Sequence, residues 1–134
     1  MNEIKIDENL RIKGFFDDQT STISYVVHDN IEKKCAVIDS VLDFDYSSGD
    51  IDYVNADKII SYVDQNKLNV EWLIETHVHA DHLSASPYIQ KKLGGKIGIS
   101  EKISDIQNIF GKTFNAGTEF QRDGTVSYTH LRAH

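Results

Sequence analysis

Three histidines and one aspartate stand within six positions of this sequence, in the segment 76–82, which reads THVHADH. Neutral imidazoles and ionised carboxylates are ligands suited to zinc, iron or manganese. Packing explains such a cluster poorly, because buried polar groups need hydrogen-bonding partners. The segment therefore predicts a metal site whose candidate ligands are His77, His79, Asp81 and His82. Asp81 is in addition the candidate catalytic residue.

The residues before the cluster must position it. The apolar run 70–74 predicts a strand that ends just before the cluster. In an extended segment, positions two apart point the same way, so His77 and His79 would share one side. A turn into a helix would then redirect Asp81 and His82 toward a neighbouring point. Two adjacent metals could hold a hydroxide and a substrate oxygen together, and α/β sheets place such sites beyond the carboxyl ends of strands.

The rest of the chain predicts alternating strands and helices. Between residues 56 and 111 this alternation favours an α/β fold. Ser21–Val27 and the acidic stretch 43–52 are interpreted as a strand and a surface loop, and Trp72 as a core residue. The other expected elements are strands at 34–38 and 96–100 and helices at 56–65 (capped by Asn55), near 86–93 and at about 101–110.

Composition narrows the class of protein. The chain has 134 residues, enough for one domain, and 14 Lys and Arg against 21 Asp and Glu give a net charge of -7. An acidic surface argues against binding to nucleic acid. Cys35 is the single cysteine, so no intrachain disulfide can form. No secretory signal and no apolar run of membrane-spanning length is visible, so a cytoplasmic protein that does not enter the membrane is expected.

The THVHADH segment resembles the T-H-x-H-x-D-H signature of the metallo-β-lactamase fold superfamily, and the resemblance extends over about residues 15–125. It implies the N-terminal part of an αββα sandwich, of α/β (α+β) class, with the metal site at one edge. Four stretches look closest to persulfide dioxygenases, including bacterial β-lactamase hydrolase-like proteins. These stretches are 20–25, 35–43, 75–85 and 92–99.

The resemblance leaves the chemistry open. In persulfide dioxygenases one Fe²⁺ is held by two histidines and an aspartate, which implies His77 as a ligand and His79, Asp81 and His82 as residues that orient the site. The substrate would be glutathione persulfide, oxidised to sulfite. In thioesterase-type relatives, similar to glyoxalase II, the same four residues bind two metals such as zinc and the substrate is a glutathione thioester. A non-catalytic metal-binding module is the third option, and a homodimer is left open.

One departure from the family concerns the downstream ligands. The family uses a further histidine and an aspartate, yet residues 83–125 contain no histidine, and neither Asp105 nor Asp123 is a convincing ligand. Residues 126–134 resemble a translated sequencing adapter, so His130 and His134 are not recruited as ligands. We therefore expect residues 1–125 to be a truncated N-terminal portion of the domain that is inactive alone, followed by a non-native tail at 126–134.

Two further residues lie near predicted strand ends. Asp39 could accept a hydrogen bond from a metal-bound histidine, although an ordinary turn aspartate is the favoured interpretation. His28 is followed by Asp29 and Asn30 and is interpreted as a solvated histidine in a turn.

Overall fold

The computed structural model describes residues 3–5, 8–77, 79 and 82–99. A six-stranded sheet has the order β1-β2-β3-β4-β7-β9, and a second sheet has the order β6-β5-β8. The strands are β1 (Glu3–Lys5), β2 (Leu10–Asp17), β3 (Thr22–Asp29), β4 (Lys34–Ile38), β5 (Val41–Phe44), β6 (Ile51–Asp52), β7 (Asn69–Glu75), β8 (Leu83–Ser84) and β9 (Lys96–Ile99). The helices are α1 (Val54–Gln65) and α2 (Ser86–Leu93).

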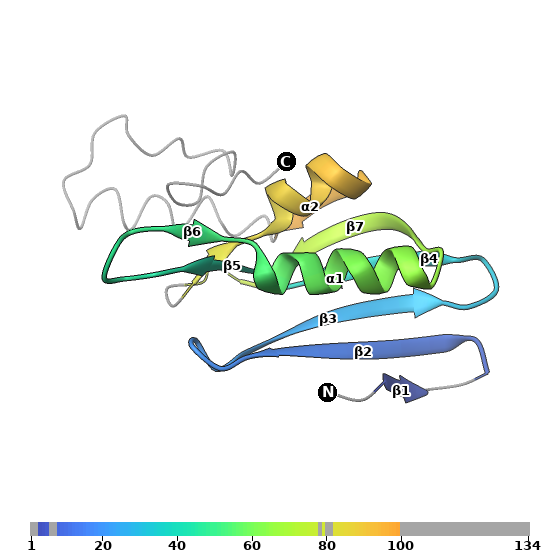
Figure 1. Cartoon of the computed structure of the whole chain (residues 1–134). Coiled ribbons are helices and arrows are strands. Elements are labelled where there is room, and N and C mark those ends of the chain that lie inside the picture. The colour runs from blue at the N-terminus through green and yellow to red at the C-terminus, as the bar shows by residue number, and fades with distance from the viewer. Residues whose placement is uncertain (1–2, 6–7, 78, 80–81, 100–134) are drawn as a thin grey trace.

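The large sheet is mixed. Strands β1 to β4 pair antiparallel, whereas β4, β7 and β9 run parallel to one another. Helix α1 connects β4 to β7 through the small sheet, and α2 connects β7 to β9, as parallel neighbours require a crossover. Both helices lie over the same face of the large sheet (Figure 1). The expected α/β class is confirmed.

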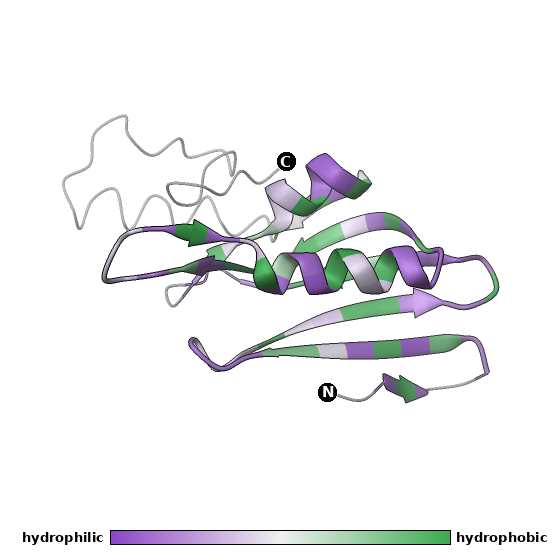
Figure 2. Ribbon diagram, viewed as in Figure 1, coloured by the Kyte–Doolittle hydropathy of each residue, from purple (hydrophilic) through white to green (hydrophobic). Residues whose placement is uncertain are grey.

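The core lies between the large sheet and its helices. Helix α1 buries Ala56, Ile59 and Val63, which recur at helical spacing, and α2 contributes Ile89. Alternate residues of the central strands meet them from the sheet, among them Val37. Apolar and polar residues follow one another along the ribbons of the two helices in Figure 2, as expected when only one side of each helix faces the sheet.

The opposite face of the large sheet is apolar and has little cover among the described residues. Side chains alternate along a strand, so the neighbours of the core residues point away from the helices. Trp72 shows this most clearly, since it is 45% exposed beside the buried Leu73. The expectation that Trp72 fills the core is therefore wrong for the described part of the chain, because the side chain of Trp72 points away from the helices.

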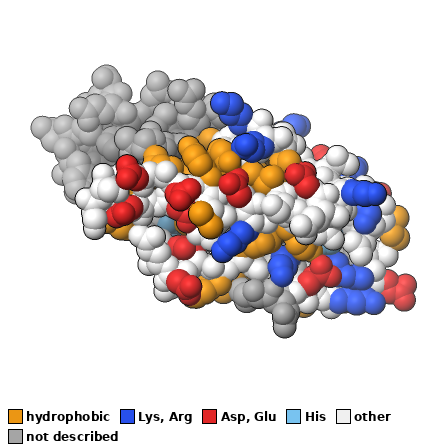
Figure 3. All heavy atoms as spheres, in the orientation of Figure 1, with side chains coloured by type: hydrophobic (Ala, Val, Ile, Leu, Met, Phe, Trp, Pro, Cys, Tyr) orange, Lys and Arg blue, Asp and Glu red, His pale blue; other side chains and the backbone are white. Residues whose placement is uncertain are grey.

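Two local expectations, on the stretch 43–52 and on Asn55, are corrected. The acidic stretch 43–52 is not only loop, since it includes parts of β5 and β6, which pair as a hairpin. Figure 3 shows acidic side chains near the end of the molecule where this hairpin lies. Asn55 does not cap α1, because the N-cap is Tyr53 and the amide of Asn55 instead donates to Asp17 and Asp43.

His28 is not a solvated turn residue. It lies inside β3, opposite Arg11 and Cys35, and is 2% exposed. Pairing on both sides extends β3 through Asp29, which a reading of the local His-Asp-Asn sequence could not reveal.

The structure also bears on the expected absence of a membrane span, whereas several predictions for the C-terminal part fall outside the described residues. No helix among the described residues is long and apolar enough to cross a membrane. The expected helix at about 101–110, Asp105, Asp123 and the tail at 126–134, with His130 and His134, lie outside the described residues.

Candidate metal centre

The site forms where two parallel strands end side by side. Ile38 of β4 pairs with Ile74 of β7, so Asp39, just after β4, and Glu75, the last residue of β7, lie at the same edge of the sheet. The backbone N–H of Asp39 donates to the carbonyl of Ile74 at 2.9 Å. The carbonyl of Asp39 accepts the hydroxyl of Ser24 at 2.7 Å. We call this place, where Asp39 after β4 meets the end of β7, the Asp39 corner. These two hydrogen bonds fix its backbone, and it carries the polar groups of the site.

Asp39 is the hub of the corner. Its Oδ1 accepts the backbone N–H of Thr76 at 2.8 Å and lies 2.9 Å from Nε2 of His79. Its Oδ2 accepts the Thr76 hydroxyl at 2.6 Å. The backbone of Asp39 is left-handed, with φ of 53°, a conformation that Asp tolerates better than most residues. Asp39 is thus not an ordinary turn aspartate, and the interpretation that we favoured from the sequence is wrong.

The same hydrogen bonds assign the ring protons. Thr76 Oγ1 gives its own proton to Asp39, so it can accept from Nδ1 of His77, which lies 2.8 Å away. This leaves Nε2 of His77 with a lone pair. In the neutral form of His79, which is the form that binds a metal, the proton on Nε2 faces Asp39 and Nδ1 keeps a lone pair. One carboxylate therefore prepares two histidines as ligands, in the way that carboxylates behind metal-bound histidines do.

The corner fits a metal ion by its donor set. One possible ligand atom from each of Asp39, His77 and His79 falls in a group within 4.8 Å of one another. The rings of His77 and His79 are 4.1 Å apart between centroids. His77 is exposed whereas His79 is buried, so an ion could reach the group from solvent. Two imidazole nitrogens in this setting suit zinc or ferrous iron.

Electrostatics at the corner stabilise opposite charges. Burial alone would raise the pKa of Asp39, but hydrogen bonds from His79 and Thr76 lower the pKa to about 2. Burial would likewise lower the pKa of His79, yet its hydrogen bonds to Asp39 and Glu75, and their charges, raise the pKa to about 9. Without a metal, the corner therefore holds an ion pair between Asp39 and His79 at neutral pH.

His82 lies on the inner side of the same cluster. Its ring stands 4.1 Å from the ring of His79 between centroids, and it is 7% exposed. Its Nδ1 is 3.4 Å from the hydroxyl of Thr22, at the start of β3. The structure thus brings the rings of His77, His79 and His82 into one row, and their role as metal ligands stays a prediction. Asp81, which we predicted as a ligand and as the catalytic residue, lies outside the described residues.

Comparison with known proteins decides the family. The model of the metallo-beta-lactamase superfamily matches residues 18–124. The chain belongs to the metallo-beta-lactamase superfamily. The resemblance seen in the sequence is thereby confirmed, and the histidines that follow β7 form a possible metal site of the kind typical of this superfamily.

Individual members of the superfamily are similar over most of this chain. A probable metallo-hydrolase of Burkholderia pseudomallei is 48% identical over 87% of this chain and 40% of its own length. A beta-lactamase hydrolase-like protein of Xylella fastidiosa is 45% identical over 78% of this chain and 24% of its own length. The crystal structure of ETHE1 from Myxococcus xanthus is 26% identical with a TM-score of 0.53, covering 64% of this chain and 33% of that one. The chain thus spans well under half of each protein.

Sequence reasoning missed the roles of two residues of this candidate site, Thr76 and Glu75. Thr76 was quoted as part of the signature, but its link between His77 and Asp39 was not foreseen. Glu75 was also missed, although the alternation of β7 holds a signal, since it places a carboxylate on the same buried face as Leu73. A charged residue at an inward position needs a partner, and this need could have identified Glu75 as part of the site.

Proposed function

We propose that the protein is a metal-dependent oxygenase that holds one Fe²⁺ at the Asp39 corner. In the longer protein to which this segment would belong, it oxidises glutathione persulfide with O₂ and water to glutathione and sulfite. The observation that carries the proposal is the pair of histidines whose ring protons are tied up behind them by Asp39 and Thr76. The similarity of four sequence stretches to persulfide dioxygenases supports the choice of substrate.

The chain's own residues have distinct tasks in this proposal. His77 would hold the ion through Nε2, because its Nδ1 faces Thr76. Asp39 keeps the proton of His79 on Nε2, and His79 fills the buried side of the site. Ferrous iron with histidine and carboxylate ligands supplies open positions for O₂ and a thiol sulfur. The thiol substrate approaches from the exposed side, where His77 meets solvent.

Part of the ligand set lies elsewhere in this proposal. His77 provides one ligand nitrogen and His79 orients the site. The second histidine and the aspartate are proposed to come from the longer protein, outside the segment that the relatives share with this chain. We therefore expect residues 1–134 alone to bind metal weakly and to be inactive. Turnover of glutathione persulfide by purified residues 1–134 with added Fe²⁺ would contradict this.

A second function, hydrolysis of a glutathione thioester, is favoured by a separate observation. His82 stacks beside His79, so a second metal position could form next to the first. Two metals can activate a water for attack on a carbonyl. The name of the Burkholderia relative, a probable metallo-hydrolase, agrees with this option.

Metal analysis of the longer protein, purified without oxygen, separates the two functions. One iron per chain together with sulfite formation from glutathione persulfide supports the oxygenase. Two zinc ions per chain with release of glutathione from a thioester supports the hydrolase and overturns the oxygenase. His77→Ala is the control, since it should abolish whichever activity is found.

A further inference from the structure

Glu75 places a second carboxylate behind the ligand row. It is the last residue of β7, its side chain has no exposure to solvent, and it follows the same inward alternation as Leu73. A carboxylate removed from water needs hydrogen-bond donors around it. The two oxygens of Glu75 meet this need in different ways.

One oxygen anchors the start of α2. Oε1 accepts the hydroxyl of Ser86 at 2.8 Å and also the hydroxyl of Ser84. The Ser84 hydroxyl in turn accepts the backbone N–H of Ser86 at 3.0 Å. These bonds hold the end of β7 against the residues that follow the metal-binding segment, and they occupy Oε1.

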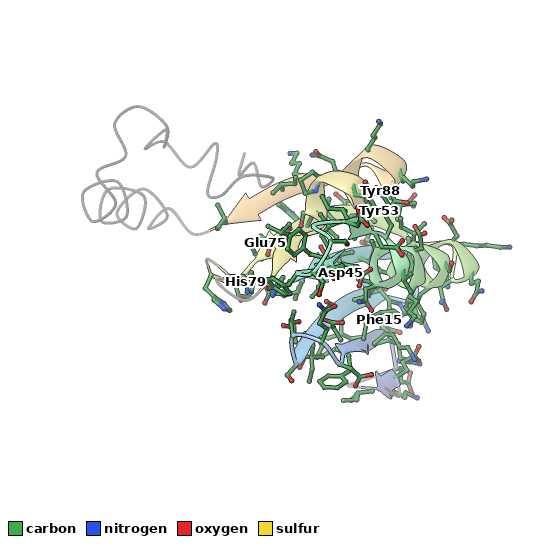
Figure 4. All side chains as sticks on the ribbon, turned by 60° about the vertical axis from the view of Figure 1, so that its left-hand side comes forward. Phe15, Asp45, Tyr53, Glu75, His79 and Tyr88 are labelled. Atoms are coloured by element: carbon green, nitrogen blue, oxygen red, sulfur yellow. The ribbon has the colours of Figure 1, made fainter. Side chains whose placement is uncertain are left out.

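The other oxygen faces the site. Oε2 is buried and makes no hydrogen bond of good geometry among the described residues, but it lies 3.3 Å from Nε2 of His79. The same Nε2 is 2.9 Å from Oδ1 of Asp39. Figure 4 shows Glu75 and His79 next to each other at the end of the strand. The proton on Nε2 is thus the donor that both carboxylates share.

We infer that Glu75 is a positioning residue for the metal site: together with Asp39 it keeps the ring of His79 oriented with N–H toward the two carboxylates and the lone pair of Nδ1 toward the metal position. This rests on the proposed function only in requiring a metal at His77. Glu75 itself does not touch the ion.

A second acceptor adds something that Asp39 cannot supply alone. Asp39 accepts hydrogen bonds from both Thr76 and His79, so only part of its hydrogen-bonding capacity orients the ring of His79. If the ring of His79 turned over, a carbon-bound hydrogen would face both carboxylates. Oε2 of Glu75 would then lose its only ring donor while still buried. The cost of such a buried, unsatisfied carboxylate oxygen selects one orientation of the ring.

The test measures the zinc affinity of the longer protein by competition with a chelator. Glu75→Gln removes the charge that faces Nε2 while the amide can still bond the serines, so zinc should bind about 10-fold more weakly or worse. Ser86→Ala is the matched control. It removes one donor from Oε1 without touching Oε2, so its zinc affinity should stay within about twofold of the wild type.

A second measurement needs no variant. Long-range proton–nitrogen NMR spectra of the zinc-loaded wild type should place the proton of His79 on Nε2. A proton on Nδ1 would overturn the inference, and so would a Glu75→Gln variant that binds zinc as the wild type does. Equal losses from Glu75→Gln and Ser86→Ala would assign Glu75 to anchoring α2 alone and would also overturn it.

The proposed function fails in a different way. If wild-type protein does not bind zinc or iron, or if His77→Ala binds them as the wild type does, the metal site itself is refuted. A wild type that binds metal through His77, with a Glu75→Gln variant of unchanged affinity, refutes only the role of Glu75.

Discussion

Two buried histidines, each near the end of a strand of the large sheet, have different surroundings in this protein. His79 follows β7 and shares its Nε2 proton between Asp39 and Glu75. His28 lies in β3 and contacts the hydroxyl of Tyr62 at 2.7 Å through Nε2. Tyr62 donates its proton to Glu3 at 2.6 Å, so His28 also reaches a carboxylate, but by way of a tyrosine.

The difference lies in what surrounds the remaining ring nitrogen. Nδ1 of His28 is buried and has no hydrogen-bond partner among the described residues. The ring of His79 instead stands between His77 and His82, and His77 opens to solvent. A carboxylate behind a histidine is therefore not enough for a metal site. Several lone pairs must also converge where an ion can enter.

The largest expected difference between the metal site and the surroundings of His28 comes from removing one histidine ring at each place. His77→Ala should abolish measurable metal binding, because it deletes a ligand. His28→Ala should leave metal affinity within about twofold of wild type and lower the free energy of unfolding by about 2 kcal/mol, as truncation of a buried side chain does. Isothermal titration and denaturant unfolding give the two numbers. Equal losses of metal binding from both variants would refute the site assignment.

Changing the residue that hydrogen-bonds to each buried histidine, Asp39 for His79 and Tyr62 for His28, should give a smaller effect. Asp39→Asn keeps the size of the side chain and tolerates the left-handed backbone, but it removes the charge behind His79. Metal affinity should fall by about 10- to 100-fold. Tyr62→Phe is the counterpart. It should leave metal affinity unchanged and reduce the free energy of unfolding by about 1 kcal/mol, since it breaks the link from His28 to Glu3.

The pKa values of the two histidines shift in opposite directions, and titration can therefore tell the two rings apart. In metal-free protein, the pKa of His79 rises from 6.5 to about 9, so this group stabilises the fold fully below pH 6.5 and the stabilisation is lost as pH rises through 9. Burial lowers the pKa of His28, with Glu3 opposing, so protonation of His28 destabilises the fold as pH falls below 6.5. Proton NMR of the two rings should show His79 titrating at the higher pH. The reverse order would contradict the ion pair at Asp39.

The smallest effect is expected at Cys35, the strand neighbour of His28. Burial raises the pKa of its thiol to about 11, with the charge of Glu71 adding to the shift. The thiolate is the reactive form, so a folded chain should resist alkylation at pH 8 while an unfolded chain reacts. Mass spectrometry after brief exposure to iodoacetamide measures the difference. Rapid labelling of the folded protein would show that the His28 end opens readily.

Local patterns in the sequence predicted part of this architecture. The apolar runs gave β4 and β7 to within a residue, and helical spacing gave α1 and α2. The ligand row was recognised because its residues are adjacent in sequence. A role for Asp39 behind a histidine was considered but not favoured, since Asp39 meets His79 across 40 positions and only the parallel register of β4 and β7 brings them together. His28 was misjudged for the same reason, as its burial depends on Arg11 and Tyr62.

The left-handed backbone of Asp39 has an evolutionary consequence. The turn accepts Asp, Asn or Gly with little strain, and both Asn and Gly lie a single base change from an Asp codon. One mutation could therefore erase the charge that prepares His77 and His79 while leaving the corner between β4 and β7 folded. Descendants of such a chain would keep the sheet, the helices and the row of histidines yet bind metal poorly.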